Sequence, residues 1–449
     1  MIGKYKLYYR VFIAVFWIAM TFGFVADELL PFLEPLRPAV FLVLDGLVVL
    51  LGLATLRQRG DIIVALSYMA IAVVSSLIVN HCSVATFVNG SRDFVGLVLM
   101  VPVLRYFLTC RYADDFRKSF NRQLRIWLWL QAFCITWQFA LYGANDHGGG
   151  SMGFGASGIT SMLIYLVSFY LITRNWDSSR YWDSLKRNKE YIFLLYPTML
   201  NETKASFIML VIYFLLLVKY DRLAVMRLLL AFPISVCAFV GLAVAYFDIT
   251  DQDPEKVLSK EFFQNYFYGE DLDFLVEVGW MLQDGEMEID PSNWWTLDIP
   301  RFAKPVLVTP MLRSETNGGV WLGAGVGQFK GGQVMSSTRF AQNNQWLLQG
   351  SKILLFFVYV QLGIIGLIWI IAVLARDLWP RVNRQIPFSR QVQLFVLADM
   401  LLIFIYNDSI RVLSFCLVFF YVALSMQPLK QADSANTVST DVCRDGTAA

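Results

Sequence analysis

The sequence predicts an all-α polytopic membrane protein with about 12 transmembrane helices and one large extracytoplasmic loop of short helices. Three observations support this prediction. The chain of 449 residues is 57% hydrophobic and has a mean hydropathy of +0.53. Only 16% of its residues are charged, whereas a soluble domain averages about 25%. Apolar stretches of membrane-spanning length recur along the chain, and the loops between them are alternately rich and poor in Lys and Arg.

Each expected span is an apolar stretch of roughly 17–25 residues, or slightly fewer where helices are short. These stretches cover residues 9–26, 38–56, 61–80, 93–110, 124–142, 157–174, 225–247, 352–375, 391–406 and 409–426. The N-terminus begins basic and turns apolar without a convincing small-residue cleavage site. We therefore expect its first span to be retained rather than removed as a signal peptide.

The stretch 188–219 is either one very long helix or two short ones, and charge decides between them. Lys and Arg collect in cytoplasmic loops, and both Lys189 and Lys219 lie in basic segments. The chain must therefore leave and return between them, as two short helices that turn at Asn201-Glu202-Thr203-Lys204 on the outer face. The same argument places a second outer turn at Tyr406-Asn407-Asp408-Ser409 and both chain ends in the cytoplasm.

The predicted organisation has four parts. Residues 1–247 form an N-terminal transmembrane bundle of about nine spans, and residues 248–350 form a large periplasmic loop. Residues 351–426 form the C-terminal transmembrane helices, and residues 427–449 form a disordered cytoplasmic tail.

Several classes of protein are excluded by what the sequence lacks. It has no phosphate-binding loop of the Walker type and no dinucleotide-binding fingerprint, and a net charge of +2 gives no reason to expect nucleic acid. The six cysteines form no C-x-x-C pair, and the two D-x-D patterns of the loop are expected to be solvated acids. We expect no metal and no cofactor.

The informative residues are cations expected at the outer face beside lipid: Lys204, Arg92 and Arg313. Such side chains hold phosphate through charge-assisted hydrogen bonds, and arginine does so with a planar fork. Each also has a structural interpretation. Arg92 fits a snorkelling side chain at a helix end, Lys204 fits a local pair with Glu202, and Arg313 fits an ordinary loop arginine.

Two acids, Asp45 and Asp399, fall inside expected spans, where an ionisable residue points to function by default. They belong either to a proton path or to bonds with a neighbouring helix. The two histidines, His81 and His147, are expected outside, as interfacial polar residues or as proton carriers.

Five short stretches resemble motifs of a known family. Thr203-Lys204-Ala205-Ser206 stands at the predicted outer turn, and "MLRSETNGGVWLGAGVGQFKGG" carries Arg313 ahead of Gly325 and Gly327. The stretch "AQNNQWLL" supplies Asn343 and Asn344 before "QLGIIGLI", and "GGGSMGFGASG" precedes a mid-chain helix. Together with the late outer loop, these motifs resemble the superfamily of O-antigen ligases and O-antigen polymerases, which assemble bacterial surface polysaccharides.

The resemblance implies a membrane glycosyltransferase of GT-C-like type in the bacterial inner membrane, whose partner is a glycan carried on undecaprenyl pyrophosphate. It implies catalytic roles for Lys204 and Arg313. It implies substrate binding by Arg92, Glu202, Gly325, Gly327, Asn343, Asn344 and Asp408. A chain-length regulator or other polysaccharide assembly proteins would be further partners. Three departures stand out: Lys204 replaces the usual arginine, the loop lacks the family's histidine, and extra residues separate Asn344 from Gly363.

Four functions remain open at this stage. A polymerase joins the glycan to another lipid-linked glycan, whereas a ligase transfers it to a lipid acceptor. We favour the polymerase because the signature is degenerate, which is typical of that branch. A secondary transporter of a polar solute would suit the number of spans and the intramembrane acids, but the long outer loop and the lack of a repeat argue against it. The fourth is a non-catalytic component of a polysaccharide secretion machine.

Overall fold

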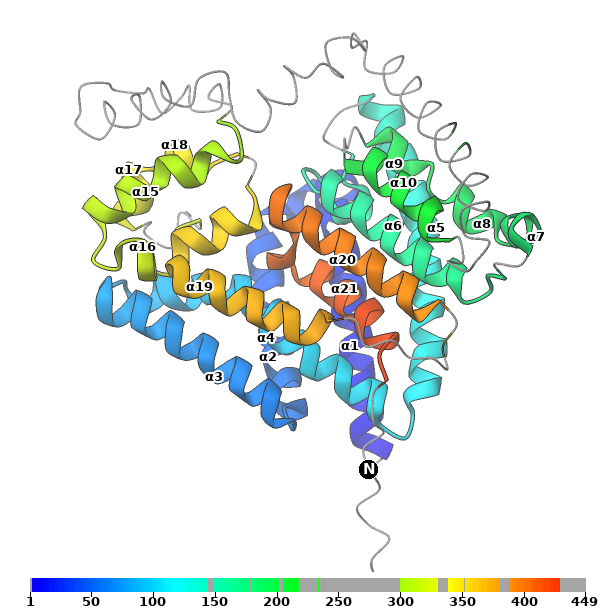
Figure 1. Ribbon diagram of the computed structural model, residues 1–449, viewed down its shortest axis with the longest axis horizontal. Coiled ribbons are helices and arrows are strands. Elements are labelled where there is room, and N and C mark those ends of the chain that lie inside the picture. The colour runs from blue at the N-terminus through cyan, green and yellow to red at the C-terminus, as the bar shows by residue number, and fades with distance from the viewer. Residues whose placement is uncertain are drawn as a thin grey trace, which may run out of the picture.

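The computed structural model describes residues 2–143, 148–177, 180–201, 205–217, 299–329, 338–350, 352–379 and 388–428, together with the single residues 233, 237 and 386. Every regular element in these ranges is a helix, which confirms the predicted all-α class (Figure 1). The predicted span 225–247, most of the predicted outer loop and the tail beyond residue 428 lie outside the described residues.

Among the described residues, five helical segments are long and apolar enough to cross a membrane. They contain α1 (Ile2–Phe24), α2 (Arg37–Thr55), α3 (Arg59–Val73), α4 (Val84–Thr109) and α19 (Leu354–Leu378). Shorter apolar helices are α6 (Ser157–Thr173) and α21 (Leu413–Ser425). An apolar surface of this extent is stable only in lipid, so the chain is a membrane protein.

The remaining elements complete the bundle and its loops. The helices are α5 (Ala113–Tyr142), α7 (Tyr181–Arg187), α8 (Lys189–Phe193), α9 (Pro197–Leu200), α10 (Ala205–Leu216), α15 (Ala303–Glu315), α16 (Gly319–Leu322), α17 (Arg339–Asn343), α18 (Gln345–Leu348) and α20 (Ser389–Ile405). Short 3₁₀ or π turns are η1 (Val25–Leu29), η2 (Pro31–Leu36), η3 (Val74–Val79), η4 (Gly150–Met152) and η7 (Ser409–Arg411).

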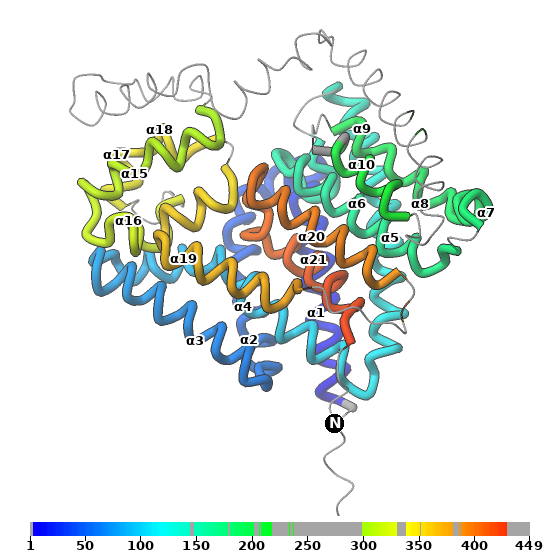
Figure 2. Tube along the Cα trace, viewed as in Figure 1, coloured from blue at the N-terminus to red at the C-terminus, as the bar shows by residue number. Residues whose placement is uncertain are grey.

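Helix α4 lies in the interior of the bundle. In its most apolar stretch 67% of the residues are buried, against 28% in α2 and in α3. Its neighbours include α2, α3, α5 and α21, and Figure 2 shows α3, α4 and α19 side by side. Buried aromatic rings pack against one another within the bundle. Phe107 stacks on Phe116 with 4.8 Å between the ring centroids, and the centroids of Phe120 and Tyr421 are 4.6 Å apart.

A second, smaller core lies at one end of the molecule. Leu307 and Met311 of α15, Leu347 of α18 and Phe356 of α19 are buried together in it. Figure 1 shows α15 to α18 gathered beside the first half of α19, at the end of the molecule away from the N-terminus. We call α15, α16, α17 and α18 the loop helices.

Helix α4 begins nine residues before the predicted span 93–110. The reason is a local cap: the hydroxyl of Ser83 accepts a hydrogen bond from the amide of Thr86 at 3.1 Å, which satisfies one of the free donors of the first turn. Arg92 therefore lies inside the helix. The sequence had suggested that it lies beside the end of a helix. The predicted span 409–426 likewise begins with the 3₁₀ turn η7, and only its later part forms α21.

The chain between Tyr191 and Tyr213 runs along α6 and back. The hydroxyl of Ser168 donates to the carbonyl of Tyr191 at 2.9 Å and lies 2.9 Å from the hydroxyl of Tyr213. Between them in sequence, Asn201 donates to Ser161, about two turns nearer the start of α6, at 3.1 Å. Two short helices were predicted between residues 188 and 219, whereas the described residues form three, α8, α9 and α10; Glu202, Thr203 and Lys204 of the predicted turn lie outside the described residues.

Candidate functional site

A glycine loop, residues 323–327, fits between three helices at the end of the molecule that carries the loop helices. Gly323, Gly325 and Gly327 all have positive φ, between 68° and 102°. A side chain at Gly327 would lie 2.7 Å from the carbonyl oxygen of Thr86, and one at Gly323 would lie 2.6 Å from that of Val360. Glycine is therefore required here both by the backbone conformation and by the close approach of neighbouring backbone.

The loop occupies a break in α19. Gly363 has φ 63° and ψ −158°, which no helical residue adopts, so the carbonyls of the preceding turn lose their helical partners. The amide of Ala324 donates to the carbonyl of Val360 at 2.8 Å, and that of Gly325 donates to the carbonyl of Gln361 at 3.1 Å. Amides from outside the helix thus satisfy two carbonyls that the break leaves without helical partners, as a helix in lipid requires.

The same loop is tied to α19 and to the π turn η3 with the residue that follows it. The amide of Gly327 donates to the side chain of Gln361 at 2.7 Å, and the amide of Val326 donates to the hydroxyl of Ser76 at 2.9 Å. Asn80 donates to the carbonyl of Gly323 at 2.8 Å. Because the amides of Gly325 and Gly327 donate within the protein, these glycines hold the loop helices against the bundle.

Four cations gather where the loop helices meet α19 and the turn before α21. We call this set, Arg301, Lys304, Lys352 and Arg411, the outer cation group. Arg301 lies with its guanidinium 4.2 Å from the centre of the Tyr406 ring and donates to the carbonyl of that residue. Lys304 is buried and donates to the carbonyl of Gln349.

Lys352 and Arg411 form the half of this group that lies against the bundle. Lys352 donates to the carbonyl of Gly350 at 3.1 Å, and its ammonium lies 5.7 Å from the centre of the Phe329 ring. Arg411 pairs with Asp408 at 2.7 Å and lies 5.7 Å from the centre of the Phe357 ring. Burial lowers the pKa of Lys352 below its ordinary value, an effect that Asp408 opposes and Arg411 reinforces.

The predicted site residues of the outer loop lie nearby on the loop helices. Arg313 is exposed in the last turn of α15, where a cation complements the helix dipole. Asn343 and Asn344 both donate to Glu315, at 3.1 Å and 3.0 Å. They are thus brought to the end of α15 that carries Arg313. Asp408, also predicted, is the partner of Arg411.

Arg92 is held by its neighbours. Its guanidinium pairs with Asp45 of α2 at 2.7 Å and donates to Asn89 at 3.2 Å. The structure thus joins two residues that the sequence singled out separately and places them in a contact between α2 and α4. Lys204 and Glu202 lie outside the described residues, as does His147.

Asn201 and Asn407, one residue from each polar turn that the sequence predicted, meet at one helix end. Asn201, the first residue of one turn, donates to Ser161 at 3.1 Å, and Asn407 of the other donates to the sulfur of Met162 at 3.0 Å. Ser161 and Met162 are consecutive residues near the start of α6. The carbonyl of Asn407 also accepts from the amide of Leu354 at 3.0 Å, which links this region to the beginning of α19.

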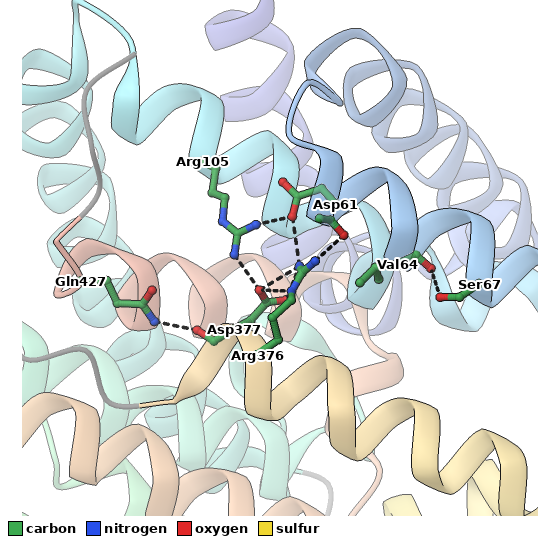
Figure 3. Close-up of polar contacts among 8 residues, drawn as sticks. Asp61, Val64, Ser67, Arg105, Arg376, Asp377 and Gln427 are labelled. Carbon is green, nitrogen blue, oxygen red and sulfur yellow. Dashed lines mark hydrogen bonds and ion pairs between the residues drawn. The ribbon is translucent and has the colours of Figure 1, made fainter. Parts of the chain in front are cut away.

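A second ionic cluster lies near the C-terminal ends of α4 and α19 (Figure 3). Asp61 and Asp377 are buried, and each contacts both Arg105 and Arg376. The Arg105–Asp377 distance is 2.6 Å and the Arg376–Asp61 distance is 3.0 Å. Gln427 donates to the carbonyl of Asp377. We call these four charged residues the four-charge cluster; its formal charges cancel.

Sequence reasoning missed both Arg411 and Arg105, although a signal was present. Each falls inside an expected span, 409–426 and 93–110 respectively, and an intramembrane cation is by default a candidate for function or for burial with a partner. Lys352 begins a predicted span and gave no comparable signal.

The fold and these clusters define an all-helical integral membrane protein with a cationic site beside its loop helices and a neutral ionic cluster at the far end of α4. The sequence matches no protein-family model and shows no significant similarity to a curated protein. Function must therefore be argued from the site itself.

Proposed function

We propose that this protein is a bacterial inner-membrane glycosyltransferase that polymerises oligosaccharide repeat units carried on undecaprenyl pyrophosphate. The acceptor hydroxyl attacks the anomeric carbon of the donor glycan and loses its proton, the bond from that carbon to the phosphate oxygen breaks, and the pyrophosphate lipid leaves. The configuration at the anomeric carbon is inverted. The product is a longer surface polysaccharide, such as O-antigen, capsule or exopolysaccharide.

The observation that carries this proposal is that Asn201 and Asn407, one from each predicted polar turn, contact consecutive residues at the start of α6. Asn407 also links this point to the beginning of α19 next to the outer cation group. Asn201 opens the turn that contains Lys204 in the sequence, and Asn407 precedes Asp408. Cations close to the developing charge of a leaving pyrophosphate are the main catalytic effect that this reaction needs. We assign the catalytic roles to Lys204 and Arg313.

The contacts also support the proposed sidedness. Segments expected on the outer face touch one another: Asn317 donates to the carbonyl of Val79 at 3.0 Å, and the amide of Phe154 donates to Asp27 at 2.8 Å. Segments expected inside do the same, as in the four-charge cluster. A reaction outside the cytoplasm needs no nucleotide sugar, because its donor arrives already linked to lipid.

The test is deletion of the gene followed by gel analysis of surface glycan and lipid-linked intermediates. We expect the deletion strain to keep single repeat units and to lose the polymer. Accumulation of finished polymer on the carrier lipid would instead identify a ligase. Unchanged glycan together with lost uptake of a polar solute would identify a transporter.

Variants then test the residues at matched amounts of protein in the membrane. Lys204→Ala should lower the rate by on the order of a hundredfold or more, and Lys204→Arg should keep most activity. Glu202→Ala should cost less, since it only orients the lysine. Arg313→Ala should abolish product, and lysine should replace Arg313 poorly because it lacks the planar fork. Equal mild defects in Lys204→Ala and Glu202→Ala would make their turn structural.

A further inference from the structure

We propose that Lys352 and Arg411 bind a phosphate-bearing anion at the adjoining N-terminal ends of α19 and α21. The inference rests on the proposed function and deepens it, because it names described residues that would hold the pyrophosphate of the lipid-linked glycan.

The two cations lie directly before two helices. Lys352 stands two residues before the start of α19 and Arg411 two residues before the start of α21. The N-caps of these helices, Ile353 and Val412, have no side chain that accepts a hydrogen bond from the first turn. The amide of Leu354 donates to the carbonyl of Asn407. The first turns of both helices nevertheless carry partial positive charge, which attracts anions.

The two cations also oppose the dipoles of the helices that they precede. A cation at a helix N-terminus opposes the helix dipole, whereas the last turn of a helix favours it. Here two cations occupy the unfavourable end of two neighbouring apolar helices, and Arg411 lies over Phe357 in the first turn of α19. An anion between them would convert both unfavourable placements into favourable ones.

Lys352 has few partners among the described residues. An ammonium group has three donors, and one carbonyl, that of Gly350, accepts from it among the described residues. Asp408 is already paired with Arg411. In the part of the chain that the structure describes, no carboxylate lies within ion-pair distance of the Lys352 ammonium, although Asp408 and Asp93 act on it from further away.

The chemistry of the site selects the ligand class. Two cations and the amide ends of two helices suit an anion with several charges and several acceptor oxygens, which describes a phosphate or pyrophosphate group. Two sources carry such a group in a membrane: the pyrophosphate of a lipid-linked glycan and the phosphate of a membrane lipid.

The experiment measures binding of inorganic pyrophosphate to the purified full-length protein by calorimetry. We expect Lys352→Gln to weaken binding at least tenfold and Lys352→Arg to keep it within about threefold. The paired variant Arg411→Gln with Asp408→Asn, which leaves no lone charge, should also weaken binding at least tenfold. Lys118→Gln, an exposed change on α5, is the matched control and should bind as the unaltered protein does.

A measurement of thermal stability distinguishes a role of Lys352 in binding from a role in supporting the fold. Without pyrophosphate, Lys352→Gln should have a thermal midpoint equal to or above that of the unaltered protein, because the change removes a cation whose surroundings disfavour its charge. A lower midpoint would show that the ammonium supports the fold and would overturn the proposal. Unchanged pyrophosphate affinity in Lys352→Gln would overturn it as well.

The lipid environment distinguishes the two sources of phosphate. Equal pyrophosphate affinity in nanodiscs of phosphatidylcholine and of phosphatidylglycerol shows that an anionic lipid headgroup does not compete for the site and favours the glycan-linked pyrophosphate. Weaker affinity in phosphatidylglycerol that depends on Lys352 assigns it to a lipid phosphate. The binding assay contains no glycan, so its result does not depend on the proposed function. If pyrophosphate binding is intact but the protein supports no polymer synthesis in cells, the proposed function is wrong and the anion site remains. Full polymer synthesis by Lys352→Gln would instead show that the proposed function does not require this site.

Discussion

The four-charge cluster gives a quantitative prediction for Asp61→Asn. The substitution keeps the shape of the side chain but removes one of two negative charges that face Arg105 and Arg376. Asp377 then remains with two arginines, and a buried positive charge is left uncompensated. Breaking a buried pair in this way costs about 3–5 kcal/mol. We expect the thermal midpoint of the detergent-purified protein to fall by on the order of 10 °C.

The control is Asp114→Asn, which removes the partner of Arg117 on α5. The side chain of Asp114 is 83% exposed, and the pair spans 3.1 Å within one helix turn. An exposed pair contributes about 0–1 kcal/mol, so the midpoint should move by no more than about 2 °C. The assay is thermal unfolding followed by a thiol-reactive dye, with both variants measured in the same detergent.

A compensating change tests the cause. Adding Arg105→Gln to Asp61→Asn restores neutrality and should recover more than half of the lost midpoint. If Asp61→Asn behaved like Asp114→Asn, or if the paired variant were less stable than Asp61→Asn alone, charge balance in the cluster would not be what stabilises this end of α4.

Three further predictions follow from single positions and use the same unfolding assay. Gly363→Ala should cost about 3 kcal/mol or more, because φ is 63° and the new carbon would lie 2.4 Å from the backbone of Trp321. Gly46→Ala, with nothing within 4 Å of the added carbon, should gain about 0.5–1 kcal/mol, and equal effects at the two glycines would refute the close-approach argument. Asp399→Val should raise stability by about 1–3 kcal/mol, since the residue is buried and its carboxylate oxygens have no hydrogen-bond partner among the described residues; a loss would reveal a partner. Burial lowers the pKa of Lys352 in the folded state, so between that pKa and about 10.5 the unfolded chain binds more protons and stability rises with pH. The advantage of Lys352→Gln over the unaltered protein should therefore be full at neutral pH and should vanish as the pH approaches 10.5; a pH-independent difference would contradict it.

Hydropathy and charge predicted the fold class, because they act over whole segments. An apolar stretch such as 61–80 must be helical in lipid whatever its neighbours do, and the structure has α3 and the π turn η3 there. The reversal predicted near Asn201 also rests on a segment property, the clustering of Lys and Arg. Helix ends depend on single bonds instead. Helix α4 begins earlier than predicted because Ser83 caps its first turn. The hydropathy of the predicted span does not depend on such a cap and could not indicate it.

The candidate site was predicted only in part, for a related reason. The glycines at 325 and 327 were visible as a pattern, but their role depends on Gly363, which breaks a helix far along the sequence and leaves carbonyls for the loop to satisfy. No local pattern states which amides will be used in that way. Partners distant in sequence, such as Asp45 for Arg92, are likewise fixed by packing alone.

The position of Arg411 before a helix could have been predicted from the sequence. It was counted inside the predicted span 409–426, where the cost of an arginine should have shortened the span or demanded a partner. Moving the start of that helix past Arg411 places a cation directly before an apolar helix, as Lys352 is placed before α19. Helix dipoles disfavour cations at that end, and among the described residues Asp408 is the one carboxylate that pairs with either cation. Such a pair at two neighbouring helices therefore leaves positive charge that a further anion would balance. The binding of pyrophosphate to Lys352→Gln, measured against Lys118→Gln, decides whether that implication holds.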